Sequence, residues 1–210
     1  MKNRFYLENS TYPIVDTYKF SISDNPEDNA ILVDIGSCRG DFLALHKDKF
    51  AECFAFEASY ENASLINKRI YEENWENCAV FNLAVSDKTG DIVSLKKADS
   101  GDAGSNSIIG GSTHNGLSQN AYTIKFNDIF EFLQIEEIDL LKMDCEGCEY
   151  VALGDADLSN IKIICMELHN WEGFTDELPK LKNKILITHD IYHEKGGGHQ
   201  IITFVRKEAL

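Results

Sequence analysis

Two pairs of reactive side chains overlap in the segment KMDCEGCEY. Cys145 and Cys148 have the C-x-x-C spacing of a redox dithiol or of half a zinc site. Asp144 and Glu146 have the spacing at which side chains share one side of a strand, because strand side chains alternate with a period of two. The segment therefore predicts either thiol or zinc chemistry, or a pair of carboxylates that faces a cleft together with Lys142.

A glycine turn and an acidic residue form a second candidate site. Gly36 and Gly40 follow an apolar run in VDIGSCRGDF, and glycines there let the backbone approach a ligand closely. The turn differs from the dinucleotide fingerprint G-x-G-x-x-G, because Cys38 replaces the middle glycine. Glu57 ends the next apolar run about 20 residues later, where a doubly wound fold holds a ribose diol. Together they predict a ligand that contains adenosine.

The charge beside this turn narrows the choice of ligand. Asp34 lies two residues before Gly36 and would repel the pyrophosphate of NAD or the phosphates of ATP. It would tolerate the ammonium and sulfonium groups of S-adenosylmethionine (SAM). The chain also has no G-x-x-x-x-G-K-[ST] phosphate loop. These features favour SAM among the adenosine ligands.

Short apolar runs must position these residues, and helix-like stretches separate the runs. Four of the runs are nearly continuous, as expected of strands buried on both faces. Between the second and third runs, Ala63, Ile66 and Ile70 form a helical stripe with Ser59 as the N-cap. Alternating strands and helices predict an α/β fold with a mostly parallel sheet and helices on both faces. The runs cover residues 30–36, 52–58, 78–86, 138–144, 161–168, 184–190 and 199–205.

The ends of the chain and one long loop complete the predicted organisation. The last two apolar runs flank a glycine turn at 196–198, which predicts an antiparallel hairpin. Residues 99–120 are rich in Gly, Ser and Asn and form either a flexible surface loop or a lid. With 210 residues and 43% hydrophobic content, we expect one domain over 30–210 after a lead-in segment over 1–29.

Composition bounds the location and the partners. No run approaches the roughly 18 apolar residues of a membrane span, and the N-terminus lacks the apolar core of a signal peptide. We therefore expect a cytoplasmic protein without membrane contact. Six cysteines lie in apolar segments, which favours free, buried thiols in a reducing compartment. The net charge of −15 repels polyanions, so we expect no nucleic-acid partner.

Four segments, taken in order, resemble a known enzyme family. VDIGSCRGDF, FAFEAS, NLAVSDKTGD and LLKMDCEGCE are similar to motifs of the FkbM family of SAM-dependent methyltransferases, with LLKMDCEGCE close to the family's lLKiDvEGaE. The resemblance spans about residues 30–170 and implies a single-domain, Rossmann-like class I fold with a seven-stranded sheet. The chain departs from the family at 36–40, where Gly-Ser-Cys-Arg-Gly replaces Gly-Ala-Asn-x-Gly and the asparagine's polar contact is lost or altered.

The resemblance also implies SAM as the cofactor and assigns residues to it. The glycine turn would line the methionine end, Glu57 would hold the ribose, and the ends of the second and third strands would flank the adenine. Asp144 would face the amino or methyl end and the acceptor. The remaining cofactor residues are Asp34, Gly36, Ser37, Cys38 and Gly40 at the turn, and Ala58, Asn82 and Ala84 at the adenine.

Ionisable residues at successive strand ends are the catalytic candidates, because ligands bind at the carboxyl edge of an open α/β sheet. Methyl transfer is an in-line displacement, and a hydroxyl acceptor must also lose a proton to a base. His169 and His189 are candidate bases because an imidazole titrates near neutrality. Asp144 and Glu146 are the other catalytic candidates. A divalent ion, Mg²⁺ or Mn²⁺, could instead bind Asp144, Glu167, His169 and Asp190.

These residues lead to one expected function and two alternatives. We expect a SAM-dependent O-methyltransferase that acts on a hydroxyl of a small molecule or saccharide, as the FkbM resemblance implies. In that interpretation Cys145 and Cys148 are packing residues. The alternatives are a SAM-binding protein without catalysis and a dithiol or zinc-binding protein that uses the two cysteines.

Overall fold

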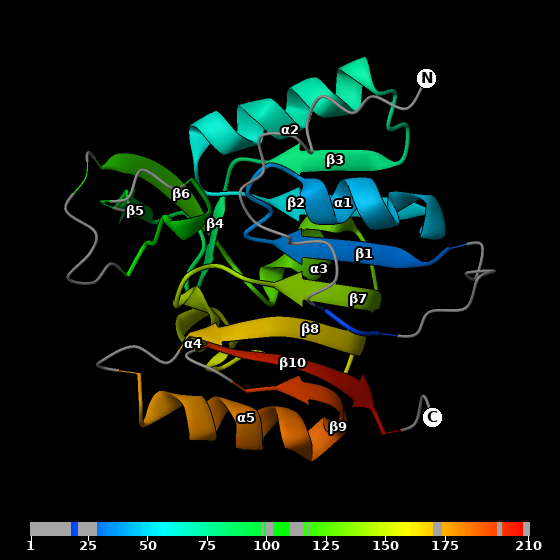
Figure 1. Ribbon diagram of the computed structural model, residues 1–210, viewed down its shortest axis with the longest axis vertical. Helices are drawn as coiled ribbons and strands as arrows, with labels where there is room; N and C mark the ends of the chain where they lie inside the picture. The colour runs from blue at the N-terminus through cyan, green and yellow to red at the C-terminus, as the bar shows by residue number, and fades with distance from the viewer. Residues whose placement is uncertain are drawn as a thin grey trace.

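Helices cover both faces of a central sheet, and a smaller sheet lies beyond the carboxyl ends of its parallel strands (Figure 1). Figure 1 shows a computed structural model of the chain. No helix in the described part is long and apolar enough to cross a bilayer. The structure describes residues 18–20, 29–97, 99, 103–109, 116, 118–169, 174–196 and 199–207.

The central sheet has seven strands in the order β3-β2-β1-β7-β8-β10-β9. All neighbouring strands are parallel except β10, which is antiparallel to both β8 and β9. Because the chain leaves β1 and β7 toward opposite edges, a crevice opens at their carboxyl ends. The predicted α/β fold with a C-terminal antiparallel hairpin is confirmed. The strands are β1 (Ile31–Ile35), β2 (Glu52–Phe56), β3 (Cys78–Phe81), β7 (Ile138–Met143), β8 (Ile161–His169), β9 (His189–Lys195) and β10 (His199–Arg206).

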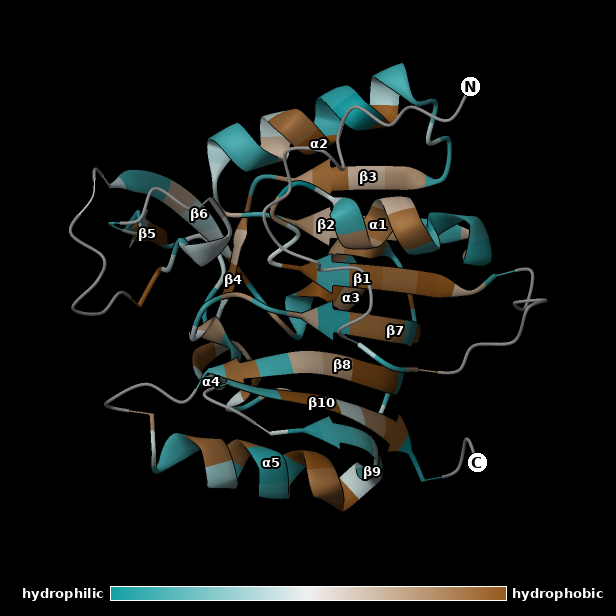
Figure 2. Cartoon of the chain, viewed as in Figure 1, coloured by the Kyte–Doolittle hydropathy of each residue, from teal (hydrophilic) through white to brown (hydrophobic). Residues whose placement is uncertain are grey.

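The two faces of this sheet bury two separate cores, because neighbouring side chains point to opposite faces. Val33 belongs to the core that includes residues of α3, α4 and α5, whereas Leu32 belongs to the core that includes residues of α1 and Trp75. Figure 2 shows apolar residues along the central strands and helices in which hydrophilic and hydrophobic residues alternate. The helices are α1 (Asp41–His46), α2 (Tyr60–Glu72), α3 (Asp128–Leu133), α4 (Cys148–Leu153) and α5 (Glu177–Thr188).

Helix α2 begins as the sequence predicts. The Ser59 side chain accepts a hydrogen bond from the backbone N–H of Asn62, which satisfies one of the unpaired donors at a helix start. Ala63 and Ile66 are buried, and Ile70 packs against the core. The predicted stripe and N-cap are therefore confirmed.

The predicted strand over 184–190 is wrong for most of its length. Residues 184–188 end helix α5, and β9 begins only at His189. Leu178, Leu181 and Ile185 are buried on one helical stripe, whereas Ile187 is 74% exposed. Ile185 and Ile187 would share one face of a strand, so their different burial follows the helical period. The hairpin survives this shift, because β9 still pairs with β10.

The structure contains a second, three-stranded sheet, in the order β4-β6-β5, that the sequence did not predict. The apolar run 78–86 does not form one strand: β3 ends at Phe81, and β4 then pairs with β6 instead of continuing the large sheet. The predicted loop over 99–120 also ends early, because its last two residues belong to β6. The bounds are β4 (Ala84–Ser86), β5 (Ile92–Leu95) and β6 (Gln119–Lys125).

Two short described pieces lie against the main body. Residues 103–109 contain a 3-10 helix (Ala103–Ser105), and Ser107 bridges to Lys96. In the lead-in segment, Tyr18 and Phe20 pack against Phe42 of α1, with ring centroids 5.9 and 6.1 Å apart. Residues 18–20 of the lead-in segment therefore pack on α1, and residues 1–17 and 21–28 lie outside the described part of the chain.

Candidate functional site

The glycine turn after β1 is pressed against the end of β7. Gly36 has a φ of 73°, a left-handed conformation that L side chains rarely adopt. A Cβ atom on Gly36 would lie 1.9 Å from the backbone oxygen of Asp144, so only glycine fits. The hydroxyl of Ser37 donates a 2.7 Å hydrogen bond to the Asp34 carbonyl and closes the turn from inside.

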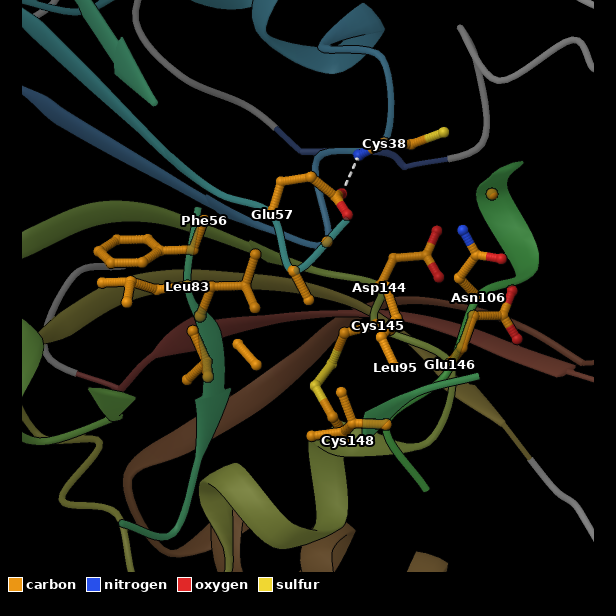
Figure 3. Close-up of a pocket in the computed structure, with 17 residues that line it drawn as sticks. Cys38, Phe56, Glu57, Leu83, Leu95, Asn106, Asp144, Cys145, Glu146 and Cys148 are labelled. Carbon is orange, nitrogen blue, oxygen red and sulfur yellow. Dashed lines mark hydrogen bonds between the residues drawn. A yellow bond between two sulfur atoms is a disulfide. The ribbon is translucent and has the colours of Figure 1, made fainter. Parts of the chain in front are cut away.

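Glu57, at the end of β2, holds the same turn from its other side. One carboxylate oxygen accepts the backbone N–H of Cys38 at 2.7 Å, and the other accepts that of Ser59 at 2.7 Å (Figure 3). Burial raises the pKa of Glu57 to about 7, although these two N–H groups favour the ionised form. The Asn82 amide donates to the carbonyls of Glu57 and Ala58 and so fastens the end of β3 to this strand end.

These elements enclose one side of a pocket whose empty space, including its open mouth, is about 480 Å³. Figure 3 shows Phe56 and Leu83 on one side of the pocket, and Asp144 and Glu146 on the other. Of the predicted cofactor and catalytic residues, those lining the pocket are Gly36, Cys38, Glu57, Ala58, Ala84, Asp144 and Glu146.

Four predicted cofactor residues, Asp34, Ser37, Gly40 and Asn82, are not part of the lining. Asp34 is fully buried, 3.1 Å from the ammonium of Lys142. Lys142 also donates to the Gly36 carbonyl at 2.8 Å and is itself buried, so the expectation that it faces the cleft is wrong. The lysine balances the charge of Asp34, and the argument that this charge selects SAM over NAD therefore loses its basis.

The sequence predicts strand geometry through Asp144 and Glu146, but the structure does not have it there. Strand β7 ends at Met143, and Glu146 has a φ of 56°. A left-handed residue breaks the period of two, so the alternation that predicted a shared side is wrong. The two carboxylates nevertheless reach the same pocket, because the turn brings Glu146 back toward the strand end.

His169, the last residue of β8, is buried between two glutamates. Its Nε2 atom lies 3.2 Å from Glu146, and its Nδ1 atom lies 3.4 Å from Glu149, which is fully buried. Burial alone would lower the pKa of His169, but the two carboxylates raise it to about 11. At this pKa the imidazole carries its proton at neutral pH, which disfavours the predicted role of His169 as a base.

Glu167 and His199 extend this cluster toward solvent. Possible ligand atoms of Glu167, His169 and His199 lie within 4.8 Å of one another, and so do those of Asp144, Glu146 and His169. Burial raises the pKa of Glu167 to about 7, and the negative charge of Asp144 adds to the shift. Mixed carboxylate and imidazole groups of this kind suit a divalent ion or a proton transfer.

His189 and Asp190 lie at the opposite end of the sheet, so the predicted convergence of these residues is wrong. His189 begins β9, and its Nε2 atom lies 2.9 Å from the carbonyl of Ile161, the first residue of β8. His189 is buried there, and burial lowers its pKa. This result follows from the late start of β9, since a residue that begins a strand parallel to β8 cannot reach the carboxyl edge.

Cys145 and Cys148 form a disulfide. Cys148 begins helix α4, and the expectation that all the cysteines are free thiols is wrong for this pair. A zinc site that uses both thiolates is incompatible with this bond, because the sulfurs are already bonded to each other. The described chain leaves four other cysteines free: Cys38, Cys53, Cys78 and Cys165.

Several lining or supporting residues were missed by the sequence analysis. Tyr18 donates a 3.1 Å hydrogen bond to Asp144, and no pattern around it indicates this contact. Leu95, Asn106 and Ile108 line the pocket from the segment that follows β4. Glu149 is the last residue of the segment LLKMDCEGCE, and the match of this segment to the family motif could have indicated its role at the site. The part of the 99–120 segment that the structure describes thus reaches the pocket.

Comparison with known proteins agrees with this geometry. The family model of the methyltransferase FkbM domain matches residues 34–201. A putative rRNA-methylase from Clostridium thermocellum has a TM-score of 0.54 at 8% identity, over 87% of this chain and 88% of that chain.

A fibrillarin pre-rRNA processing protein from Methanococcus jannaschii has a TM-score of 0.51 at 9% identity, over 90% of this chain and 70% of that chain. No curated relative matches the sequence. These structural likenesses support the fold, whereas the family model covers most of the chain. The chain therefore belongs to the FkbM methyltransferase family, whose cofactor is SAM.

Proposed function

We propose that the pocket at the ends of β1, β2 and β7 binds SAM and that the enzyme methylates a hydroxyl of a small molecule or saccharide. The observation that carries this proposal is Glu57, a buried carboxylate at a strand end beside the glycine turn. Each carboxylate oxygen can accept more than one hydrogen bond, so Glu57 can hold a ribose diol while it keeps the N–H groups of Cys38 and Ser59.

The rest of the cofactor follows from the pocket walls. Phe56 and Leu83 form an apolar side of the pocket that suits an adenine ring. The backbone of Gly36 and the carboxylate of Asp144 lie on the other side of Glu57 and suit the methionine end, whose ammonium is positively charged. In this orientation the sulfonium methyl points toward Asp144 and Glu146.

The acidic cluster supplies the chemistry for a hydroxyl acceptor. His169 is protonated and cannot accept the hydroxyl proton, but its charge fixes the carboxylate of Glu146. Glu167 has a pKa of about 7, near the pH at which a base works best, and its side chain is 21% exposed. We assign proton removal to Glu167 and acceptor alignment to Asp144, which Tyr18 holds in place.

A divalent ion is an alternative way to activate the acceptor in the same place. Either Asp144, Glu146 and His169 or Glu167, His169 and His199 would supply its ligands, and the ion would polarise the acceptor oxygen. In both sets His169 would bind the ion only after losing the proton that Glu146 and Glu149 stabilise. Activity that survives a chelator would eliminate this alternative.

The acceptor class rests on charge. Carboxylates at the pocket and the net charge of −15 repel a phosphate backbone, which argues against RNA despite the names of the two structural neighbours. A neutral polyol or a cationic small molecule has no such penalty. The charge argument concerns the acceptor alone, and RNA is one of the acceptors in the test below.

Calorimetric titration with S-adenosylhomocysteine (SAH), repeated with NAD, tests the cofactor proposal. We expect heat with SAH and none with NAD, and the reverse would refute the proposed site. Transfer of labelled methyl from SAM to saccharides, small polyols and RNA then tests the acceptor. The Asp144→Ala variant should lose turnover while it still binds SAH. A chain that binds SAH but shows no turnover on any acceptor would instead be a binding protein without catalysis.

A further inference from the structure

The disulfide between Cys145 and Cys148 lies in the wall of the proposed cofactor pocket. Both cysteines line the same cavity as Gly36 and Glu57. Figure 3 shows the bond below Asp144, between the acidic side of the pocket and Leu83 on its apolar side. In the FkbM motif that this segment resembles, the two positions hold valine and alanine, so a covalent link here is a feature of this chain.

The bond closes the turn that carries the acidic residues. Glu146 and Gly147 lie between the two cysteines, both with left-handed backbone conformations, at φ 56° and 95°. The Cys145 N–H donates to Glu149 at 2.9 Å, and the carbonyl of Glu146 accepts a 2.6 Å hydrogen bond from Ser107. The path of this turn therefore sets both the pocket wall and the position of the Glu146 carboxylate.

We propose that Cys145 and Cys148 form a reversible thiol–disulfide site that controls the affinity of the pocket for SAM, with the disulfide state binding more tightly. This inference rests on the proposed assignment of the pocket to SAM. The partners that operate the site are a thiol reductant and a disulfide oxidant, either small molecules or protein dithiols.

Reduction of the disulfide proceeds by thiol exchange in two steps. A thiolate of the reductant attacks a protein sulfur, the Cys145–Cys148 bond breaks, and a mixed disulfide forms. A second thiol of the reductant resolves it, so the protein gains two electrons and two protons and the reductant becomes a disulfide. Cys145 is half-buried and Cys148 is only 3% exposed, so the attack falls on Cys145.

The nearest free thiol does not take part in this exchange. Cys38 also lines the pocket, but burial and the charge of Glu57 raise its pKa to about 12. It therefore stays a thiol, which is a poor nucleophile, and the exchange remains confined to the bonded pair.

Reduction changes the shape of the wall. Bonded sulfurs lie about 2 Å apart, whereas two thiols in contact need about 3.5–4 Å. Two thiols therefore need about 1.5–2 Å more room, which rotation of their side chains or movement of the turn must supply in the wall that lines the pocket. Contact at van der Waals distance is lost over such a shift, so we expect SAH to bind at least about fivefold more weakly to the reduced protein.

Titration of SAH into the oxidised and the fully reduced protein tests the proposal. Peptide mapping with a thiol-alkylating reagent verifies which cysteines are bonded in each sample. The Cys145→Val/Cys148→Ala double variant carries the residues of the family motif and should bind SAH with one affinity in both conditions. Cys78→Ala is the matched control, because Cys78 lies at the amino end of β3, outside the pocket lining, and this variant should keep the difference.

The outcomes separate this inference from the proposed function. SAH binding that is equally tight in both redox states overturns the inference and leaves the pocket assignment intact. A redox difference that persists in the double variant also overturns it, because another thiol would then be responsible. Absence of SAH binding in both states overturns the pocket assignment and, with it, the inference.

Discussion

The raised pKa of Glu57 predicts that cofactor affinity depends on pH. A ribose diol donates its hydrogen bonds to an ionised carboxylate, and burial places the pKa of Glu57 at about 7 in the free protein. The ionised fraction therefore falls from about nine-tenths at pH 8 to about one-tenth at pH 6. SAH should bind about tenfold more weakly at pH 6 than at pH 8, because the carboxylate must lose a proton before it accepts the diol.

Calorimetric titration with SAH at pH 6, 7 and 8 measures this dependence. Glu57→Gln should bind about thirtyfold more weakly than the wild type at pH 8, a loss of about 2 kcal/mol for charge-assisted hydrogen bonds. Its affinity should no longer vary over this range. Glu167→Gln is the matched control, since it removes the other carboxyl with a pKa of about 7 and should keep the pH dependence.

Two results would refute this reasoning. One is a wild-type affinity that stays constant between pH 6 and pH 8. The other is a Glu57→Gln variant whose affinity changes with pH as the wild type's does. Thermal unfolding of each variant shows whether a weaker affinity reflects lost folding, because Glu57 also accepts the N–H groups of Cys38 and Ser59.

Two further predictions concern the turn and the buried imidazole. Gly36→Ala should abolish SAH binding, because its Cβ would lie 1.9 Å from the Asp144 carbonyl oxygen, and a melting temperature and affinity equal to the wild type's would contradict this. His169→Gln should destabilise the protein by about 3–5 kcal/mol in chemical denaturation, because Glu146 and Glu149 lose their shared cation. The pKa of His169 rises from its ordinary 6.5 to about 11, so its stabilising effect is full below about pH 6.5 and is lost progressively toward pH 11. A variant as stable as the wild type at pH 6 would show that the imidazole is not charged.

The sequence predicts the large sheet well because burial on both faces leaves a direct signal. Uninterrupted apolar runs mark β1, β2, β7 and β8, and the glycine turn after β1 stands out within its own segment, although the backbone of Asp144 is what requires glycine there. The prediction for the end of α5 was wrong because the seven-residue segment KILITHD is rich in branched residues and contains only Ile185 of the buried stripe formed by Leu178, Leu181 and Ile185. A longer window contains that stripe.

The site was predictable where one residue acts alone and unpredictable where partners are distant. Glu57 follows from its position at a strand end. The pairing of Asp34 with Lys142 joins residues 108 positions apart, and the contact of Tyr18 with Asp144 joins residues 126 apart. Neither pairing leaves a local pattern. The role of His169 depends on two glutamates whose geometry requires the folded turn.

The small sheet suggests how enzymes with this framework can change their acceptors. Strands β4 and β6 pair in parallel and β5 also pairs with β6, so the chain between residues 86 and 119 starts and ends within the small sheet. The described residues of that segment supply Leu95, Asn106 and Ile108 to the pocket, but no strand to the large sheet. A segment anchored in this way can be exchanged between relatives as a cassette, leaving the strand ends that carry Gly36 and Glu57 unaltered.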